Sequence, residues 1–480
     1  MKRNEWCCFP SKNNPKIYIN KASSLESALK LYQPYSKKGY IAKKTVNSCC
    51  PLSFFSVNTD QSIQLQLVAI YQKIVEVLGE NVSAVNYSLG TPGPHQKITA
   101  QVVDNKGDIY CYVKIAAKES LGHLLETEKT ALELIAEQFA NKSFQFPKVL
   151  AWEGFDLQQM VFLTAAPHDK RASLKLNNAD ILFITDLHQH AGRPLIMADY
   201  LQNVADELNR CEVDGSIVSE LSEMVSLISA FLPGNQFETC YSHGDYAPWN
   251  TFSDSEQGTF IFDWEYFSAS RPLFYDLFHY VFMTERLINH ATEEEVVKSL
   301  MALWLNPLCN PLFRLKEITF EQMCAYLSLY LMDQMTRLSK DYSAYILYLM
   351  KCLSLVVEAL GKCRGRKKIL VSAYACEPEH GSEPGVGWNW LTQIAVNHDV
   401  TVITKENNRL YLDQGIIDNP LLSITPVYVA VPRWLSFWKK KQRGVRTYYY
   451  LWQFFAYLQA RKLNRQNKFD LAHHVTFVND

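Results

Sequence analysis

The hydrophobic pattern of the chain begins with alternating segments and then becomes helical. Alternation of apolar and polar residues in 97–104 and 109–116, across a short polar turn, predicts the two strands of a β-hairpin. A helix is expected to begin after Ser120, with its leucines and isoleucines on one side. Two further runs, 146–153 and 158–166, have the composition of strands. This part of the chain is therefore predicted to form a small β-rich half.

Beyond Pro167 the periodicity is mostly helical as far as Cys363, interrupted by one short sheet-like island at 241–267. At Arg364 the pattern changes again, because a basic run leads directly into an apolar strand, 369–376, and a glycine-containing turn. These changes predict three segments: an N-terminal extension at 1–79, an α+β domain at 80–363 and an α/β domain at 364–480.

The charge is unevenly distributed along the 480 residues. Residues 364–480 contain 16 lysines and arginines against 9 aspartates and glutamates, which is +7, so the preceding residues carry −8 of the total of −1. A total this close to neutral excludes a chain devoted as a whole to nucleic acid, and we expect no nucleic-acid partner. With 48% hydrophobic and 20% charged residues, most of the chain is predicted to fold.

Targeting and membrane signals are not expected. The N-terminus, MKRNEWCCFPSKNN, lacks the apolar core of a signal peptide. The apolar stretch 344–360 is interrupted by Lys351 and Glu358, so no membrane span is predicted. The twelve cysteines are spread along the chain without the spacing of zinc knuckles, which favours reduced thiols. These features predict a cytoplasmic protein.

The strongest chemical signal is the pair of segments YSHGDYAPWNTF and TFIFDWEYF. They place two acids and an amide, Asp245, Asn250 and Asp263, on turns between apolar strands. Phosphoryl transfer needs a carboxylate that orients the attacking hydroxyl and accepts its proton, and oxygen ligands that hold Mg²⁺ against the phosphates. Asp245 fits the first role, and Asn250 with Asp263 fits the second. Each acid alone could simply cap a turn, but the combination favours catalysis.

Lys114 stands in the middle of a predicted strand, where an ammonium among apolar neighbours is costly unless it meets an anion. The alternative is an edge-strand lysine directed into solvent. Glu128, on the following helix, is the expected partner of Lys114, with Glu126 as a competitor. Gly90 and Gly93, in the turn SLGTPGPHQK, could let backbone amides approach phosphate oxygens, although the G-x-G-x-x-G spacing is absent.

The segments HGDYAPWN and IFDWE resemble the catalytic loop and the metal-binding loop of aminoglycoside and choline kinase-like phosphotransferases. The resemblance covers roughly residues 80–360 and implies a bilobal α+β fold like that of protein kinases, with ATP and Mg²⁺ as cofactors. Lys114 resembles the lysine that binds the nucleotide phosphates in that family. Ala247 and Trp249 depart from the common pattern, so the resemblance leaves the acceptor open.

The same resemblance implies a role for each residue of the loops. Asp245 is the catalytic base, and Asn250 and Asp263 are the magnesium ligands. His243 is a structural residue that braces the loop. Asp276, in RPLFYDLFHYVF, is similar to the aspartate that ties down the helical lobe in that family.

Two segments of the C-terminal part, KKILVSAYACEPEHGSEPGVGWNW and FDLAHHVTFVND, resemble the beginning of a family 4 glycosyltransferase, a group built from two Rossmann-like domains. The resemblance implies a partial α/β Rossmann-like domain at 364–480, on the acceptor side, in which Gly381, Gly385 and Gly387 let the backbone approach a ligand. The nucleotide-sugar domain of that family does not follow before Asp480, so either the transferase is truncated or a separate glycosyltransferase partner carries the remaining half.

Residues 433–465 mix aromatic side chains with cations. One interpretation is a core helix with a solvated basic end, and the other is a patch that contacts the inner face of a membrane peripherally. For the whole chain we predict an ATP-dependent kinase whose acceptor is a hydroxyl of a small molecule, such as a sugar or a cell-envelope precursor. The alternative is a scaffold or glycosyltransferase-associated protein whose C-terminal segment works with a separate partner.

Overall fold

The computed structural model describes residues 5–11, 15–32, 41, 43–46, 60–90, 96–116, 118–139, 143–155, 158–210, 215–254, 256, 258–337, 343–364, 367–378, 381–419, 422–436 and 445–475. Their contacts divide the chain into two compact units. The first consists of Met1–Pro194 and Glu238–His290, and the second of Leu195–Phe237 and Ala291–Asp480.

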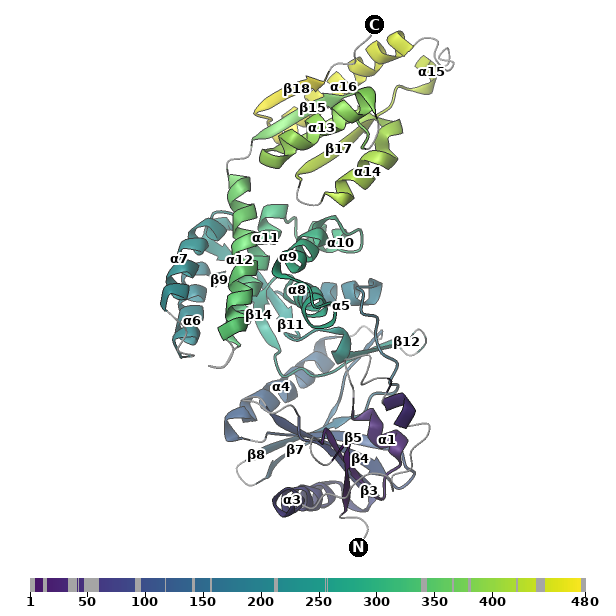
Figure 1. Cartoon of the computed structure of the whole chain (residues 1–480), viewed down its shortest axis with the longest axis vertical. Coiled ribbons are helices and arrows are strands. Elements are labelled where there is room, and N and C mark those ends of the chain that lie inside the picture. The colour runs from purple at the N-terminus through teal and green to yellow at the C-terminus, as the bar shows by residue number, and fades with distance from the viewer. Residues whose placement is uncertain are drawn as a thin grey trace. The chain divides into compact units, whose positions relative to one another are not determined.

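The first unit is built on a seven-stranded antiparallel sheet (Figure 1). Its order is β1 (Trp6–Phe9), β2 (Ile17–Asn20), β3 (Val82–Ser88), β4 (Lys97–Asp104), β5 (Ile109–Ala116), β8 (Gln158–Thr164) and β7 (Val149–Phe155). The predicted hairpin is confirmed, because β4 pairs with β5 in the register Lys97↔Ala116. Lys114 lies opposite Thr99 on β4 and opposite Val161 on β8, so it belongs to an interior strand. The interpretation of Lys114 as an edge-strand lysine is therefore wrong.

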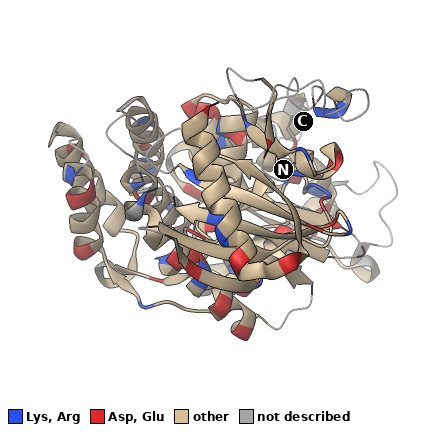
Figure 2. Ribbon diagram, turned by 90° about the horizontal axis from the view of Figure 1, so that it is seen from below, with Lys and Arg blue, Asp and Glu red and all other residues tan. Residues whose placement is uncertain are grey.

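Two helices cover opposite faces of this sheet (Figure 1). Helix α3 (Gln61–Leu78) buries Leu67, Ile70 and Ile74 in one core cluster with Val113 and Ile115 of β5. Because side chains alternate along a strand, Lys114 must point to the opposite face. That face is covered by helix α4 (Gly122–Gln138), which contacts β5, β7 and β8. Lys and Arg positions are interspersed with Asp and Glu positions along the ribbon (Figure 2).

The N-terminal segment supplies part of this sheet. β1 pairs with β2, and β2 pairs with β3 through Tyr18↔Tyr87. The indole of Trp6 is fully buried, donates from Nε1 to the Val85 carbonyl at 2.8 Å and contacts the Tyr87 ring. Asn86 also links β3 to β2, because its Oδ1 accepts from the backbone N–H of Asn20. The segment predicted as an extension thus contributes two strands and helix α3 to the same lobe.

Short elements complete the first unit around the two segments that carry the acids. They are the pair β11 (Thr239–Ser242) and β14 (Ser268–Pro272), the small sheet of β12 (Thr251–Asp254), β13 (Gly258–Ile261) and β6 (Phe144–Gln145), and helices α5 (Asn178–Gln189) and α8 (Tyr275–Met283). The predicted sheet-like island at 241–267 is confirmed by β11, β12 and β13.

The second unit contains a group of helices, with the bounds α6 (Met197–Arg210), α7 (Gly215–Ser229), α9 (Glu293–Ala302), α10 (Asn310–Leu315), α11 (Phe320–Thr336) and α12 (Ser343–Arg364). Side-chain caps start two of them, Thr292 before α9 and Thr319 before α11. The stretch Ala344–Lys362 of α12 is long and apolar enough to cross a membrane, judged by length and composition. In the structure 44% of it is buried, and α12 packs against α7, α9 and α11.

The C-terminal part of this unit is a four-stranded parallel sheet in the order β17 (Ile424–Val429), β16 (Asp399–Lys405), β15 (Lys368–Ala373) and β18 (Leu471–Val475). Helices α13 (Ser382–Asn397) and α14 (Arg409–Asp418) share one apolar cluster with it. Helix α16 (Val445–Asn467) forms a separate cluster with β15, β16 and β17 through Trp452. An α/β architecture is therefore present where the sequence predicted one.

We predict that Trp6→Ala destabilises the protein by about 3–5 kcal/mol, because it removes a fully buried indole and leaves a cavity. Leu65→Ala is the control, since Leu65 is 72% exposed on α3. Urea unfolding followed by circular dichroism measures both. A loss for Trp6→Ala no larger than that of the control would show that β1 is not part of the core.

Candidate active site

The loop after β11 can form only with glycine at position 244. Gly244 has φ +84°, and a Cβ there would lie 2.1 Å from the Tyr266 carbonyl oxygen. This close approach brings the segment after β11 against the segment after β13. The two motifs that the sequence singled out are therefore adjacent in space.

The side chain of Asp276 holds the backbone of this loop. The carboxylate of Asp276 lies in the first turn of α8, and it accepts from the N–H of His243 at 2.8 Å and from that of Gly244 at 2.9 Å. His243 completes the anchoring, because its Nε2 donates to the Phe262 carbonyl at 3.0 Å while its Nδ1 accepts from the N–H of Asp245 at 3.2 Å. Burial lowers the pKa of His243, which fits a neutral ring with one donor and one acceptor. These contacts agree with the bracing roles expected for His243 and Asp276.

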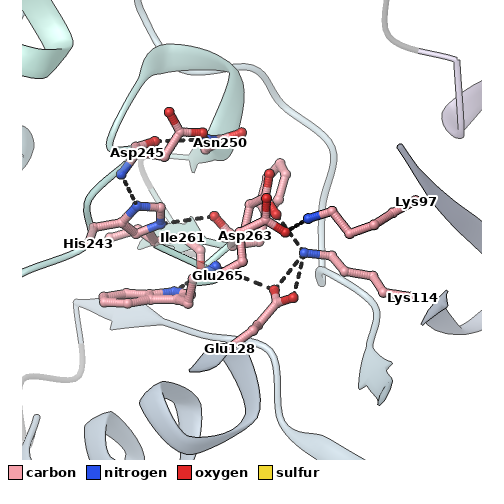
Figure 3. A network of polar contacts seen from close by, with 11 residues as sticks. Lys97, Lys114, Glu128, His243, Asp245, Asn250, Ile261, Asp263 and Glu265 are labelled. Atoms are coloured by element: carbon pink, nitrogen blue, oxygen red, sulfur yellow. Dashed lines mark hydrogen bonds and ion pairs between the residues drawn. The ribbon is translucent and has the colours of Figure 1, made fainter. Parts of the chain in front are cut away.

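Both carboxylate oxygens of Asp245 are hydrogen-bonded. Asn250 Nδ2 donates to Asp245 Oδ2 and to the Asp245 carbonyl, each at 2.8 Å (Figure 3). Because both partners are acceptors, this nitrogen assignment directs Asn250 Oδ1 away from Asp245. The second oxygen, Oδ1, lies 2.8 Å from Nε2 of His279, a buried residue of α8. His279 was not predicted from the sequence, although its spacing of three from Asp276 places both on one side of a helix.

Lys114 is the centre of a buried ion network. Its Nζ lies 2.6 and 2.7 Å from the two carboxylate oxygens of Glu128 and 2.6 Å from Asp263 Oδ1 (Figure 3). Burial alone would lower the pKa of Lys114, but the Asp263 and Glu128 carboxylates raise it above its ordinary value. Burial alone would raise the pKa of Asp263, but the charges of Lys114 and Lys97 lower it to about 2. Lys114 and Asp263 therefore form an ion pair near neutral pH.

The pairing of Lys114 decides between the two candidate glutamates. Glu128 is fully buried on α4, whereas Glu126 is exposed. Glu128 Oε1 also accepts from the N–H of Trp264 at 3.3 Å, which connects the helix to the loop of Asp263. The expectation that Glu128 pairs with Lys114 is confirmed.

A second lysine and a third acid join this ion network, and neither was predicted from the sequence. Lys97, the first residue of β4, forms an ion pair with Glu265, and both side chains are largely buried. One carboxylate oxygen from each of Glu128, Asp263 and Glu265 lies within 4.8 Å of the others. Carboxylate and amide oxygens are the ligands that Mg²⁺ prefers. The carboxylates gathered around Asp263 therefore offer the kind of ligands that fit a magnesium ion.

The expected phosphate-binding glycines are only partly described. Gly90 has φ +69°, and a Cβ there would lie 2.6 Å from the Lys97 carbonyl oxygen. The close backbone approach thus explains a glycine at this position without a ligand. Gly93 lies outside the described residues, and its role stays a prediction.

Tyr246 links the loop after β11 to helix α5. Its hydroxyl donates to Asp180 Oδ1 at 2.8 Å, and both residues are buried. Asp180 also closes the capping box of α5 with Asn177. Burial raises the pKa of Asp180 to about 6, although the hydrogen bonds from Tyr246 and the Asn177 backbone favour the ionised form. Near neutral pH, the ionised form of the Asp180 carboxylate is therefore stabilised by these two hydrogen-bond donors.

Comparison with known proteins gives matches only among solved structures. No family model and no curated protein matches the chain. The GDP and kanamycin complex of APH(2")-IIia is 14% identical, with a TM-score of 0.40, and the match covers 62% of this chain and 98% of that chain. A thermostable mutant of aminoglycoside phosphotransferase APH(4)-Ia with ADP and hygromycin B is 13% identical, with a TM-score of 0.41 and coverage of 60% and 98%. ADP-bound aminoglycoside phosphotransferase APH(2'')-Ib is 13% identical, with a TM-score of 0.33 and coverage of 56% and 98%. Each match covers 98% of the solved chain but less than two thirds of this one.

We predict that Tyr246→Phe destabilises the protein by about 1–3 kcal/mol near neutral pH, because a buried carboxylate loses a donor. The folded-state pKa of Asp180, about 6, lies above its ordinary value of 3.8. Stability from this group is therefore fully present below 3.8 and is lost as the pH rises through 6. Since the missing donor matters most for the ionised carboxylate, the cost should shrink at about pH 5.

Tyr280→Phe is the matched control for this prediction. The Tyr280 hydroxyl donates to the Ser173 carbonyl at 2.6 Å, an acceptor that does not titrate. Urea unfolding of both variants at about pH 5 and pH 7.5 measures the difference. An equal cost of Tyr246→Phe at both pH values would show that Asp180 does not ionise in this range.

Proposed function

We propose that the protein is an ATP-dependent phosphotransferase that transfers the γ-phosphate to a hydroxyl group of a small molecule. The observation that carries this proposal is Lys114, which is held on an interior strand by Glu128 of α4 and by Asp263. In protein kinases a strand lysine pairs with a helix glutamate, and an aspartate and an asparagine hold Mg²⁺ beside the catalytic aspartate. Asp263, Asn250 and Asp245 provide those three groups here.

Each residue of the site has a separate task in this proposal. Asp245 orients the acceptor hydroxyl and accepts its proton as the oxygen attacks the γ-phosphorus and the bond from that phosphorus to the bridging oxygen of ADP breaks. Lys114 binds phosphate oxygens of the nucleotide and holds them for an in-line attack. Asn250 Oδ1 and Asp263 would hold Mg²⁺, which neutralises charge on the phosphates when bound. Glu128 keeps Lys114 on the face of the sheet where the catalytic loops lie.

We further propose that residues 364–480 form a Rossmann-like half domain that works with a separate glycosyltransferase partner, and that 433–465 contact the inner face of a membrane. The parallel sheet supports the first part. Gly387 of α13 supports it as well, because a Cβ at this position would lie 2.1 Å from the Ala375 carbonyl oxygen, so glycine allows the helix to approach the segment after β15 closely. The outward side chains Tyr450, Phe454 and Tyr457 of α16 support the second. Because this segment lies on the same chain, we propose a sugar or a cell-envelope precursor as the acceptor. The spread of the cysteines along the chain supports the cytoplasm as the proposed location.

The C-terminal proposal predicts that the full chain sediments with vesicles containing phosphatidylserine and less with neutral ones, because anionic lipid attracts its cations. Replacement of Phe454 and Tyr457 by serine should weaken the binding. The same protein, offered nucleotide sugars without a partner, should transfer none. Binding to neither vesicle would contradict the membrane contact, and sugar transfer by the chain alone would contradict the need for a partner.

For the proposed kinase site we predict that substitutions of two aspartates impair different steps, turnover in one variant and nucleotide binding in the other. Asp245→Asn should lower turnover of Mg-ATP by about 100-fold or more while nucleotide affinity stays nearly unchanged, because the base acts only in the chemical step. Asp263→Asn should instead weaken nucleotide binding most at limiting Mg²⁺, because it removes a charged metal ligand. Phosphate release and calorimetric nucleotide titration measure these effects.

Asp108→Asn is the control for both substitutions. Asp108 is an exposed carboxylate in the turn between β4 and β5, and its loss should change neither turnover nor binding. Wild-type turnover in Asp245→Asn would overturn the assignment of the base. Magnesium-independent nucleotide affinity in the wild-type protein would overturn the metal site.

A further inference from the structure

We propose that His279 is a positioning residue, whose Nε2–H fixes the carboxylate of Asp245 in the orientation needed to accept the proton of the acceptor hydroxyl. The inference rests on the proposed function and goes beyond it. His279 lies on α8, outside the two motif-bearing loops. Nε2 of His279 lies 2.8 Å from Asp245 Oδ1.

The contact requires a proton on Nε2. An ionised carboxylate only accepts hydrogen bonds, so a ring nitrogen at this distance from Oδ1 must be the donor. Asn250 Nδ2 donates to the other oxygen, Oδ2, also at 2.8 Å. With both oxygens held, the carboxylate of Asp245 cannot rotate about its Cβ–Cγ bond. Each oxygen keeps a further lone pair, so the acceptor hydroxyl can still be bound.

The surroundings hold the imidazole in place. The side chain of His279 is only 2% exposed, and its ring stacks on Tyr275, with centroids 6.2 Å apart and an interplanar angle of 10°. Motion of the ring is therefore limited by packing on the same helix. A donor on a rigid element positions its partner more accurately than one on a loop.

Helix α8 thus fixes the loop at two levels. Asp276, in its first turn, holds the backbone N–H groups of His243 and Gly244. His279, three residues later, holds the side chain of Asp245. The first contact sets where the loop lies, and the second sets how the carboxylate is turned. Loss of such alignment typically lowers turnover by about 100-fold when a group moves by an ångström.

Two substitutions distinguish a hydrogen-bond donor from a packing ring. His279→Phe keeps the ring and its stacking but has no donor, whereas His279→Gln loses the ring but has an amide nitrogen of similar reach to Nε2. We expect His279→Phe to lower kcat for Mg-ATP, with water as acceptor, by about 10- to 100-fold with KM nearly unchanged. His279→Gln should keep kcat within about threefold of the wild type. Tyr280→Phe, on the same helix, is the control and should keep full turnover, because Tyr280 donates to the Ser173 carbonyl instead of Asp245.

The opposite order, with turnover kept in His279→Phe and lost in His279→Gln, would overturn the inference. Absence of Mg-ATP turnover in the wild type would instead overturn the proposed function. In that case the ¹⁵N shifts of the His279 imidazole decide the inference, with exposed His123 as the reference ring. A protonated Nε2 that responds to Asp245→Ala supports the contact. An unprotonated Nε2, or one that does not respond, overturns it.

Discussion

The burial of the Lys114 ammonium is the constraint on which the first unit depends. An ammonium on an interior strand, away from water, is tolerated only with ionised partners in contact. Glu128 and Asp263 provide them, and they come from elements separated by 135 positions along the chain. Removing one partner of a buried pair typically costs about 3–5 kcal/mol, because the remaining charge is left without compensation. The network therefore fixes α4 and the loop of Asp263 against β5.

Unfavourable backbone conformations gather around the same site. Asp263 has φ +72° and Phe274 has φ +65°, and neither is a glycine. Such residues cost about 1–3 kcal/mol each and persist only where the surroundings stabilise them. Lys114 holds the side chain of Asp263, and the N–H of Phe274 donates to Nε2 of His188 at 2.9 Å. The ion pair of Asp263 and the hydrogen bond of Phe274 thus compensate for the backbone strain at these two residues. The strained conformations turn Asp263 toward Lys114 and allow α8 to begin after Phe274.

Local patterns were enough to predict the hairpin of β4 and β5 and the loop acids, because alternation and turn residues act over a few positions. The helical periodicity alone did not show whether Glu126 or Glu128 pairs with Lys114. The answer depends on where β5 places Lys114 relative to the helix. The pairing of β2 with β3 was not predictable, since it joins residues 69 positions apart, Tyr18 and Tyr87. Non-local pairing leaves no periodic signal in either strand.

Lys97, Glu265 and His279 were missed for a related reason. Each is an ordinary residue of its own element, and only the fold brings its charged or polar atom to the site. Glu265 lies two residues after Asp263, but that spacing becomes meaningful only because both residues follow β13 and turn toward Lys97 and Lys114. Contacts that join elements distant in sequence depend on packing, which a single sequence does not display.

The charges of the assembled network bear on the form in which a nucleotide can bind. Two lysines, Lys97 and Lys114, meet three carboxylates, Glu128, Asp263 and Glu265, so the network is net negative. Phosphates alone would add repulsion to Asp263 and Glu265 while competing with them for the lysines. In the proposed function, a divalent cation that arrives with the phosphates would change this balance, because it would give Asp263 a new partner as the phosphates take over Lys114. The exchange would replace one set of anionic partners of the buried ammonium with another, and the proposed site would therefore favour the magnesium complex over the free nucleotide.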